Sequence, residues 1–273
     1  MIVFTLKLPI LLAILASFKG AIAPPTTERN RNNKDKILID LNISGSRTAR
    51  IEVIPSMKFP CGTNYTVRRN ARHTHIIGNV RDNDELIISG DPTAMSRYVL
   101  NVRGERGFRY VKVITRYRVA CSYTTHIKEF WRESINDMYK DVQREPMTLN
   151  ILEQTGDEYI SARLIALENP QEEEDAESLS SPLHVPAVYD IRPQYRLHYF
   201  IGMVKYGEYT VDNQIQGLVE RRVIWEGRLG DPKITVISLY KDGDETEAVY
   251  KFGFTEDQFK LLDYKRKFIE LYE

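Results

Sequence analysis

The sequence contains few cysteines and no excess of charge of either sign. Only 2 of its 273 residues are cysteine, and 38 Lys/Arg residues balance 38 Asp/Glu residues. Two cysteines exclude a disulfide-dense small scaffold and a four-cysteine zinc module. The balanced charge argues against a dedicated nucleic-acid-binding protein, since such proteins usually carry a net positive charge. With 42% hydrophobic residues, the chain suits one large globular domain or two smaller ones.

Sequence motifs for catalysis are also missing. The chain has no glycine-rich phosphate-binding motif, no Walker lysine motif and no nucleophile elbow. His73 and His75 would share one side of a strand, but no carboxylate or cysteine at ligand spacing completes a metal site. Lys241–Glu245 is acidic but lacks the remaining ligands of an EF-hand loop, so we expect a hairpin turn there. We therefore predict no catalytic, cofactor-binding or metal-binding residues and no cofactor.

Long apolar runs are scarce, and the amino-terminal one is short. Pro9–Phe18 is an apolar core of about 10 residues, and Ala21–Ala23 fits the cleavage rule of secretory signals. A bilayer span needs about 20 apolar residues. We therefore predict that residues 1–23 are a signal peptide and that the mature chain is secreted without stable membrane insertion. Residues 24–36 are polar and proline-led, and we expect a flexible arm.

Secretion would expose the chain to disulfide formation and to glycosylation. In an oxidising compartment we expect Cys61 and Cys121 to form one disulfide, and the alternative is a pair of buried free thiols. Asn42 and Asn64 each begin a formal glycosylation sequon. Use of the sequons depends on the host cell, so they do not decide the function.

Two parts of the chain repeat the same order of features. Alternating apolar residues open a strand at Ile37–Leu41, and a similar stretch opens at Met147. Leu86–Pro92 resembles Val223–Pro232, which puts Ile87 or Ile88 in the place of Trp225. Each Gly-Asp-Pro is followed by a strand, a polar turn and a second strand; the strands are Tyr98–Val102 and Phe108–Val113 in the first copy, and Ile234–Tyr240 and Ala248–Phe252 in the second.

The end of each copy carries a pattern that is typical of a capped helix. Ser134 precedes Asp137 by three residues, and Thr255 precedes Gln258 by three, each ahead of apolar residues at helical spacing. We therefore predict a mainly β (α+β) fold of two tandem antiparallel β-sheet modules, residues 37–146 and 147–273, each ending in a packed helix.

The balanced total hides a charge difference between these modules. Residues 37–146 carry 18 Lys/Arg and 12 Asp/Glu, a net charge of +6, whereas residues 147–273 carry 14 and 24, a net charge of −10. Much of the acidity lies in residues 168–190, which we expect to form an exposed acidic loop. The difference indicates either faces with different partners, head-to-tail contact between modules, or neutral drift of solvated surfaces.

Basic residues of the first module gather between Arg103 and Arg118, with Lys112 among them. Arg116 and Arg118 would share one face of a strand. This is a possible basic face for an anionic partner such as a nucleic acid, a lipid or a glycan. Alternation of this kind also occurs in any sheet with one solvated face, which we favour here, and we predict no nucleic-acid partner.

Three aromatic residues of the second module are candidate core residues. Trp225, placed on a strand, can anchor the module's core, and an exposed binding hot spot is the alternative. Phe254 and Phe259 flank Thr255 at the spacing of a hydrophobic staple. We expect all three side chains to be structural.

Four segments of the chain match the pattern of a known family. They are two short opening strands, a valine followed six residues later by tryptophan, and an aromatic strand that runs into a Thr-started helix. The segments are Ile39–Leu41, Leu149–Ile151, Val219–Trp225 and Tyr250–Phe259. This arrangement resembles the FAINT domain, a repeated module of secreted proteins in the piroplasm parasites Theileria and Babesia.

The resemblance implies an exported, non-enzymatic protein that binds a host protein or glycan, as a host-cell modifier or a surface antigen. Two alternatives remain open. A secreted β-barrel or sandwich that carries a small apolar ligand would need a cavity inside one module. A secreted hydrolase of unrecognised type would need a nucleophile and a base that converge in a cleft.

Overall fold

The computed structural model describes residues 36–45, 48–153, 156–165, 186–228, 230–253 and 257–269. The predicted signal peptide, the arm up to residue 35, Phe254, Thr255 and residues 168–185 of the acidic loop lie outside the described residues. Residues 187–190 of that loop belong to a strand.

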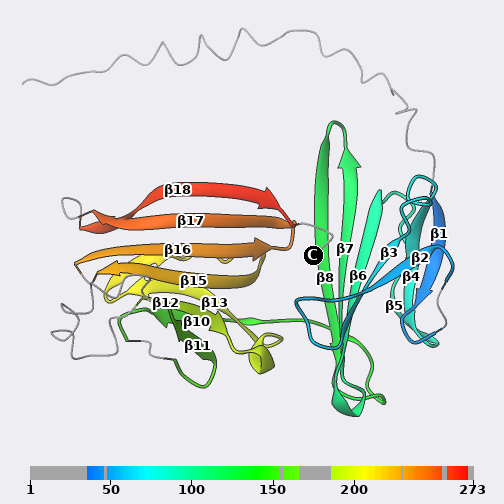
Figure 1. Ribbon diagram of the computed structural model, residues 1–273, viewed down its shortest axis with the longest axis horizontal. Helices are drawn as coiled ribbons and strands as arrows, with labels where there is room; N and C mark the ends of the chain where they lie inside the picture. The colour runs from blue at the N-terminus through cyan, green and yellow to red at the C-terminus, as the bar shows by residue number, and fades with distance from the viewer. Residues whose placement is uncertain are drawn as a thin grey trace, which may run out of the picture. The chain divides into compact units, whose positions relative to one another are not determined.

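The first module consists of two β-sheets that pack on one core (Figure 1). A three-stranded sheet has the order β1-β4-β5, with β1 parallel to β4, and a six-stranded antiparallel sheet has the order β2-β3-β6-β7-β8-β9. The strands are β1 Ile37–Asn42, β2 Ile51–Pro55, β3 Gly62–Val67, β4 His75–Asp82, β5 Glu85–Ile88, β6 Ser96–Arg103, β7 Arg109–Val119, β8 Ser122–Arg132 and β9 Lys140–Asp141.

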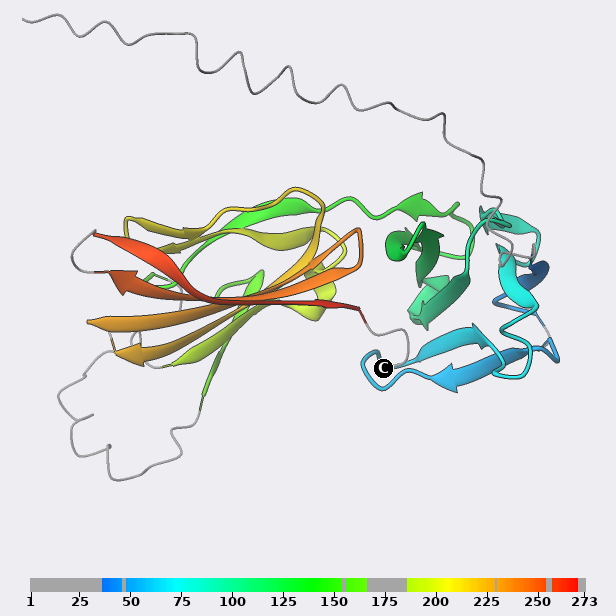
Figure 2. The same cartoon turned by 90° about the horizontal axis from the view of Figure 1, so that it is seen from above.

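The second module repeats this plan strand for strand, and Figure 2 shows its sheets as two layers. Its three-stranded sheet has the order β10-β13-β14, again with a parallel first pair, and its six-stranded sheet the order β11-β12-β15-β16-β17-β18. The strands are β10 Glu145–Asn150, β11 Ile160–Leu164, β12 Ala187–Ile191, β13 Tyr199–Tyr206, β14 Tyr209–Asp212, β15 Leu218–Arg228, β16 Asp231–Tyr240, β17 Asp244–Gly253 and β18 Gln258–Phe268. The predicted mainly β architecture of two similar modules is confirmed.

Each module encloses its own apolar core between its two sheets, because alternate residues of a strand point to the same side. Val99, Val111 and Ile77 meet in the first core. Trp225 is fully buried in the second core, where Tyr206 packs against it with ring centroids 6.3 Å apart. Phe259 is half-buried and packs against the same core.

A buried arginine at the same place in each module shows how closely the repeat is kept. In β6, Arg97 donates to the Thr115 hydroxyl at 3.2 Å and to the Gly78 carbonyl at 2.6 Å. In β15, Arg221 donates to the Ser238 hydroxyl at 3.0 Å and to the Gly202 carbonyl. This equivalence matches β6 with β15 and β7 with β16.

The two Gly-Asp-Pro triplets do not lie at equivalent places in the two modules, because they are displaced from each other by one strand. The first triplet precedes β6, whereas Asp231 and Pro232 of the second lie in β16, the counterpart of β7. The residue that stands in the place of Trp225 is therefore Asn101 of β6 and not Ile87 or Ile88. A tight turn between apolar strands recurs in any antiparallel sheet, so the pattern alone does not identify which hairpin it belongs to.

The predicted terminal helices are wrong, since the described residues contain no α-helix and only two single-turn 3-10 segments, Glu105–Gly107 and Pro193–Tyr195. Ser134 does donate to the Asp137 carboxylate, from its hydroxyl at 2.8 Å and its backbone amide at 2.9 Å, but these bonds close a turn before β9. Gln258–Phe268 pairs along β17 as β18. Pairing with β17 supplies partners for both strands' backbone groups, which outweighs the helical spacing.

The predicted disulfide is absent, and Cys61 and Cys121 are exposed free thiols rather than buried ones. Cys61 accepts from the amide of Arg103, whose strand partner is Arg109 at the start of β7. Cys121 lies in the turn after Val119, at the other end of β7. Ten residue steps of a strand correspond to about 33 Å, far beyond the ~7 Å between Cα atoms that a disulfide allows.

Within the described part of the chain, no helix has the length and apolar character to cross a bilayer.

Candidate functional site

Side chains of the two modules meet at a small apolar cluster. Ile114 and Ile127 of the first module pack with Val219 and Leu239 of the second. The Ile127 amide on the outer edge of β8 donates to the Lys241 carbonyl, in the turn between β16 and β17, at 2.8 Å. These contacts hold polar and apolar side chains from both modules around a common space.

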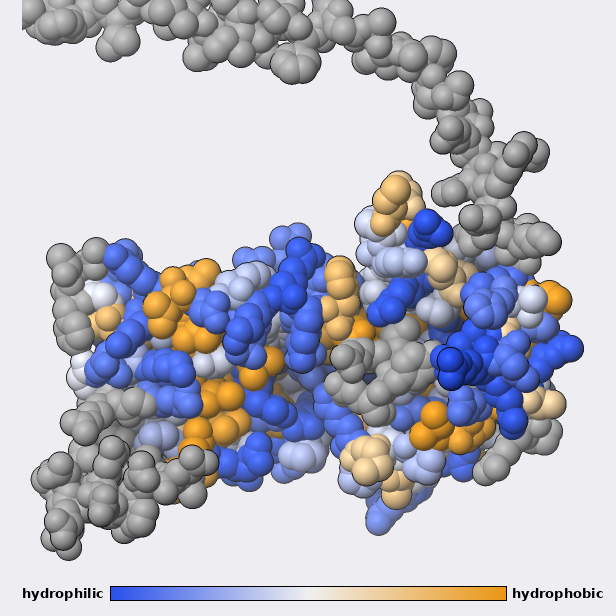
Figure 3. All heavy atoms as spheres, turned by 45° about the horizontal axis from the view of Figure 1, so that its top comes forward, coloured by the Kyte–Doolittle hydropathy of each residue, from blue (hydrophilic) through white to orange (hydrophobic). Residues whose placement is uncertain are grey.

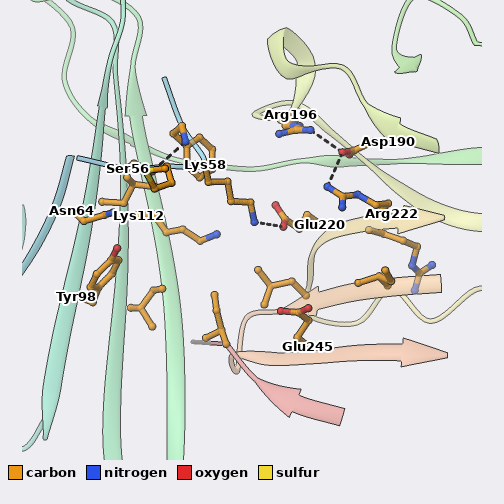
Figure 4. Close-up of a pocket in the computed structure, with 18 residues that line it drawn as sticks. Ser56, Lys58, Asn64, Tyr98, Lys112, Asp190, Arg196, Glu220, Arg222 and Glu245 are labelled. Carbon is orange, nitrogen blue, oxygen red and sulfur yellow. Dashed lines mark hydrogen bonds and ion pairs between the residues drawn. The ribbon is translucent and has the colours of Figure 1, made fainter. Parts of the chain in front are cut away.

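One cavity beside this cluster has a volume of about 550 Å³ (Figure 4). Lys58, in the loop between β2 and β3, reaches across it to Glu220 of β15, with Nζ 3.7 Å from Oε1. Tyr98, Leu100, Ile114, Ile237 and Leu239 supply apolar wall. The cavity therefore combines an apolar surface with charged groups from both modules.

A second cavity of about 610 Å³ has aromatic walls. The two cavities meet at the Lys58–Glu220 ion pair and share four further lining residues, Phe59, Asp190, Arg196 and Arg221. The ring of Trp131 packs edge-on against His198 with centroids 5.3 Å apart. The remaining aromatic residues that line it are Phe59, Phe108, Tyr110, Tyr199 and Phe200.

A buried ion pair forms part of the wall of the second cavity. Arg144 binds both carboxylate oxygens of Glu129, at 2.7 and 3.0 Å, and the Tyr110 hydroxyl donates to the same carboxylate. Burial by itself would raise the pKa of Glu129, but the bonds from Arg144 and the charge of Lys112 hold this pKa below its ordinary value. Burial, together with the Glu129 charge, raises the pKa of Tyr110 well above its ordinary value. The carboxylate is therefore ionised and the phenol neutral at physiological pH.

Lys112 of β7 is the cross-strand neighbour of Glu129, and its charge acts on both Glu129 and Glu220. Its residue surface is 8% exposed. Glu220 lines both cavities, and 49% of its side-chain surface is exposed. Burial would raise the pKa of Glu220, and the charges of Lys112 and Lys58 outweigh it, so that its pKa is lowered.

The opposite wall carries a second charged group. Asp190 of β12 accepts from Arg196 at 2.8 Å and lies 3.6 Å from the guanidinium of Arg222. Figure 4 shows the Asp190 carboxylate between these two arginine side chains. The arrangement leaves one positive charge more than the single carboxylate neutralises.

The predicted basic face does not form a continuous surface. Arg116 is half-buried, and its Nη2 donates to the Ile269 carbonyl of the second module at 3.3 Å, whereas Arg118 is exposed near the end of β7. Figure 3 shows the viewed face as mainly hydrophilic with separate small hydrophobic patches.

The remaining candidate residues take structural positions. His73 is exposed, while His75 is buried and bonds Arg50 at 2.8 Å. Asn42 accepts from the amides of Ser44 and Asn83, each at 3.0 Å. Asn64 is 5% exposed, so the folded chain encloses the amide that a glycan would need. The Lys241–Glu245 segment forms the expected turn from β16 into β17.

The described residues bring together no three His, Cys, Asp or Glu side chains that could hold a metal ion. Sequence analysis placed Lys112 in a basic cluster but missed Lys58, Glu129, Arg144 and Glu220 as its neighbours. The available signal was a lysine inside the apolar stretch Val111–Ile114.

Comparison with protein families, curated proteins and solved structures finds no match for the chain. The resemblance to the FAINT domain therefore stays a prediction.

Proposed function

We propose that this chain is an exported, non-enzymatic binding protein whose ligand occupies the two cavities between its modules. The observation that carries the proposal is the meeting of cavities of about 550 and 610 Å³ at the Lys58–Glu220 pair. Small-molecule sites in proteins have volumes of about 300–1,000 Å³, apolar walls and a few convergent polar groups. Both cavities have these properties.

The resemblance to FAINT domains supports a host molecule as the ligand of an exported parasite protein. The aromatic walls around Trp131 favour a ligand with a flat or apolar body, whether it is a free small molecule or one exposed end of a host protein or glycan. Aromatic surfaces of this kind supply most of the affinity in many binding sites. A carrier that holds its ligand inside one module is less favoured, since both cavities draw their walls from two modules.

The proposal is tested with N-phenylnaphthylamine, a neutral probe whose fluorescence rises in apolar surroundings. We expect residues 24–273 to bind it, with energy transfer from Trp131. Leu197, which lines the second cavity, is replaced by tryptophan to fill it, and we expect affinity to fall about tenfold or more. Leu164 is 64% exposed outside both cavities, so Leu164→Trp is the matched control. Equal binding by both variants, or no binding by the parent chain, would overturn the proposal.

A further inference from the structure

We infer that the ligand carries an anionic group and that the Lys112 ammonium binds it; this inference rests on the function proposed above. The ligand class is an amphiphile, with an apolar body and a carboxylate, sulfonate or phosphate. The inference depends on three features of the first cavity: an unpartnered buried cation, an excess of positive charge, and apolar wall beside both.

Lys112 is the unpartnered cation. It is more than nine-tenths buried, yet no hydrogen bond or ion pair reaches its ammonium from any residue that the structure describes. In Figure 4 its side chain extends from β7 into the cavity. Most of the side chain is enclosed, but the ammonium borders the open cavity and can take a partner from there. Lys112 therefore occupies a position where an anion would complete its interactions.

The two carboxylates nearest to Lys112 already have partners of their own. Glu129 binds Arg144 through both oxygens, and Glu220 pairs with Lys58. Lys112 acts on both only through its charge. Neutralising these two carboxylates therefore does not account for the lysine.

The lining of the cavity as a whole is also positively charged. Five cationic side chains face three carboxylates there. Of these, Arg221 pairs with Asp212, and Glu245 pairs with Lys267, two partners outside the lining. With these pairs removed, the excess is two positive charges, one at Lys112 and one at the Asp190 group described above. Such an excess attracts an anion into the cavity.

The apolar part of the ligand is indicated by the residues beside Lys112. Ile114 follows it on the same face of β7, and Leu239 packs against Ile114 from the second module. An anion with no apolar body would leave this wall in contact with water. A neutral apolar molecule would leave the lysine without a partner. An amphiphilic anion satisfies both.

The test compares anilinonaphthalene sulfonate with N-phenylnaphthylamine, two fluorescent probes that differ only by the sulfonate. We expect the parent chain to bind the sulfonate probe about 10- to 100-fold more tightly, as one charge-assisted hydrogen bond provides. Lys112→Met should remove this preference, because the sulfonate then has no cationic partner. Lys128, an exposed residue of β8, gives the matched control Lys128→Met, which should keep the preference.

The outcomes separate this inference from the proposed function. If the parent chain binds both probes equally, or if Lys112→Met keeps the preference, the anion site is overturned while the cavities remain binding sites. If neither probe binds, the proposed function is overturned as well. A structural lysine would make Lys112→Met lower the melting temperature; we expect no fall, because methionine removes an unpaired buried charge and keeps the side-chain length. Any fall beyond that of Lys128→Met therefore counts against the inference.

Discussion

The two modules share one topology but differ at the centre of their sheets. Trp225 fills the core of the second module, and the equivalent strand position of the first holds Asn101. Both residues are fully buried, and neither the indole nitrogen nor the two amide atoms has a hydrogen-bond partner among the described residues. The same backbone position therefore tolerates a large aromatic ring or a small polar group, and stability should be divided unequally between the modules.

The modules also differ in their last strand. β18 covers β17 from Asp244 to Gly253, whereas its counterpart β9 pairs with only Phe130 and Trp131 of β8. The open edge of β8 receives the Lys241 carbonyl of the second module instead. A short final strand thus leaves room for the contact that encloses the cavities, since an unpaired edge offers free backbone groups.

The two modules also differ in the residues that correspond to the cavity lining. Lys112 and Glu129 face each other across β7 and β8. The equivalent pair across β16 and β17 is Thr235 and Val249. The second module has ordinary sheet residues at these positions, and the first carries the buried charges around which the binding site is proposed.

The largest expected effect is the loss of Trp225. Trp225→Ala should destabilise the second module by about 3–5 kcal/mol, because truncating a large core side chain loses its contacts and leaves a void. Thermal unfolding followed by circular dichroism measures this. Trp131→Ala, at a half-buried position, should cost clearly less. An unchanged melting temperature for Trp225→Ala would contradict the core assignment.

The second prediction compares the two buried arginines. Arg221 adds an ion pair with Asp212 at 3.0 Å. Arg97 is bonded to the carbonyls of Gly78 and Ser89 and to hydroxyl groups, and the Asp91 carboxylate acts on it through its charge. Arg221→Met should therefore cost about 3 kcal/mol, as breaking a buried pair does, and Arg97→Met about 2 kcal/mol. Denaturant unfolding checks the order, and equal losses would show that Asp212 adds nothing.

Much of the fold could be predicted from the sequence, because alternating apolar residues specify strands and repeat in the same order in both halves. The matching of individual strands could not, because a Gly-Asp-Pro turn fits either of two neighbouring hairpins. The helices were mispredicted for a related reason. Ser134 and Asp137 form the bonds of a helix cap, but local bonds do not determine whether a turn, a helix or an edge strand follows.

The third prediction concerns Glu129, the charged residue that the second module lacks. Its pKa is lowered in the folded protein, so its contribution to stability is present above the pKa of an unfolded glutamate and is lost as pH falls through the folded value. Glu129→Gln should cost about 2 kcal/mol at neutral pH, where Arg144 loses a charged partner. The difference from the parent should narrow below about pH 4, near the ordinary glutamate pKa. A difference that is constant from pH 7 to pH 3 would contradict the assigned ionisation.

The candidate site could be predicted only in part from the sequence. Lys112 was recognisable as a charge within an apolar strand, but its neighbours come from β8, from the loop at Lys58 and from β15 of the other module. Such contacts depend on how the strands pack and not on spacing along the chain. The basic face at Arg116 was predicted from strand alternation, which does not show that the other module contacts the same strand.

The smallest expected effect concerns Asn101, the residue of the first module that is equivalent to Trp225. Asn101→Leu should stabilise the first module by about 1 kcal/mol, because it replaces a buried amide that has no hydrogen-bond partner with an apolar side chain of similar size. The melting temperature of the first unfolding transition measures the gain. Asn64 of the neighbouring strand β3, which is 5% exposed and lines the first cavity, provides the control Asn64→Leu, which we expect to bring no gain. If Asn101→Leu instead destabilises the protein, its amide has a partner such as a bound water, and the two modules differ less in their cores than their sequences indicate.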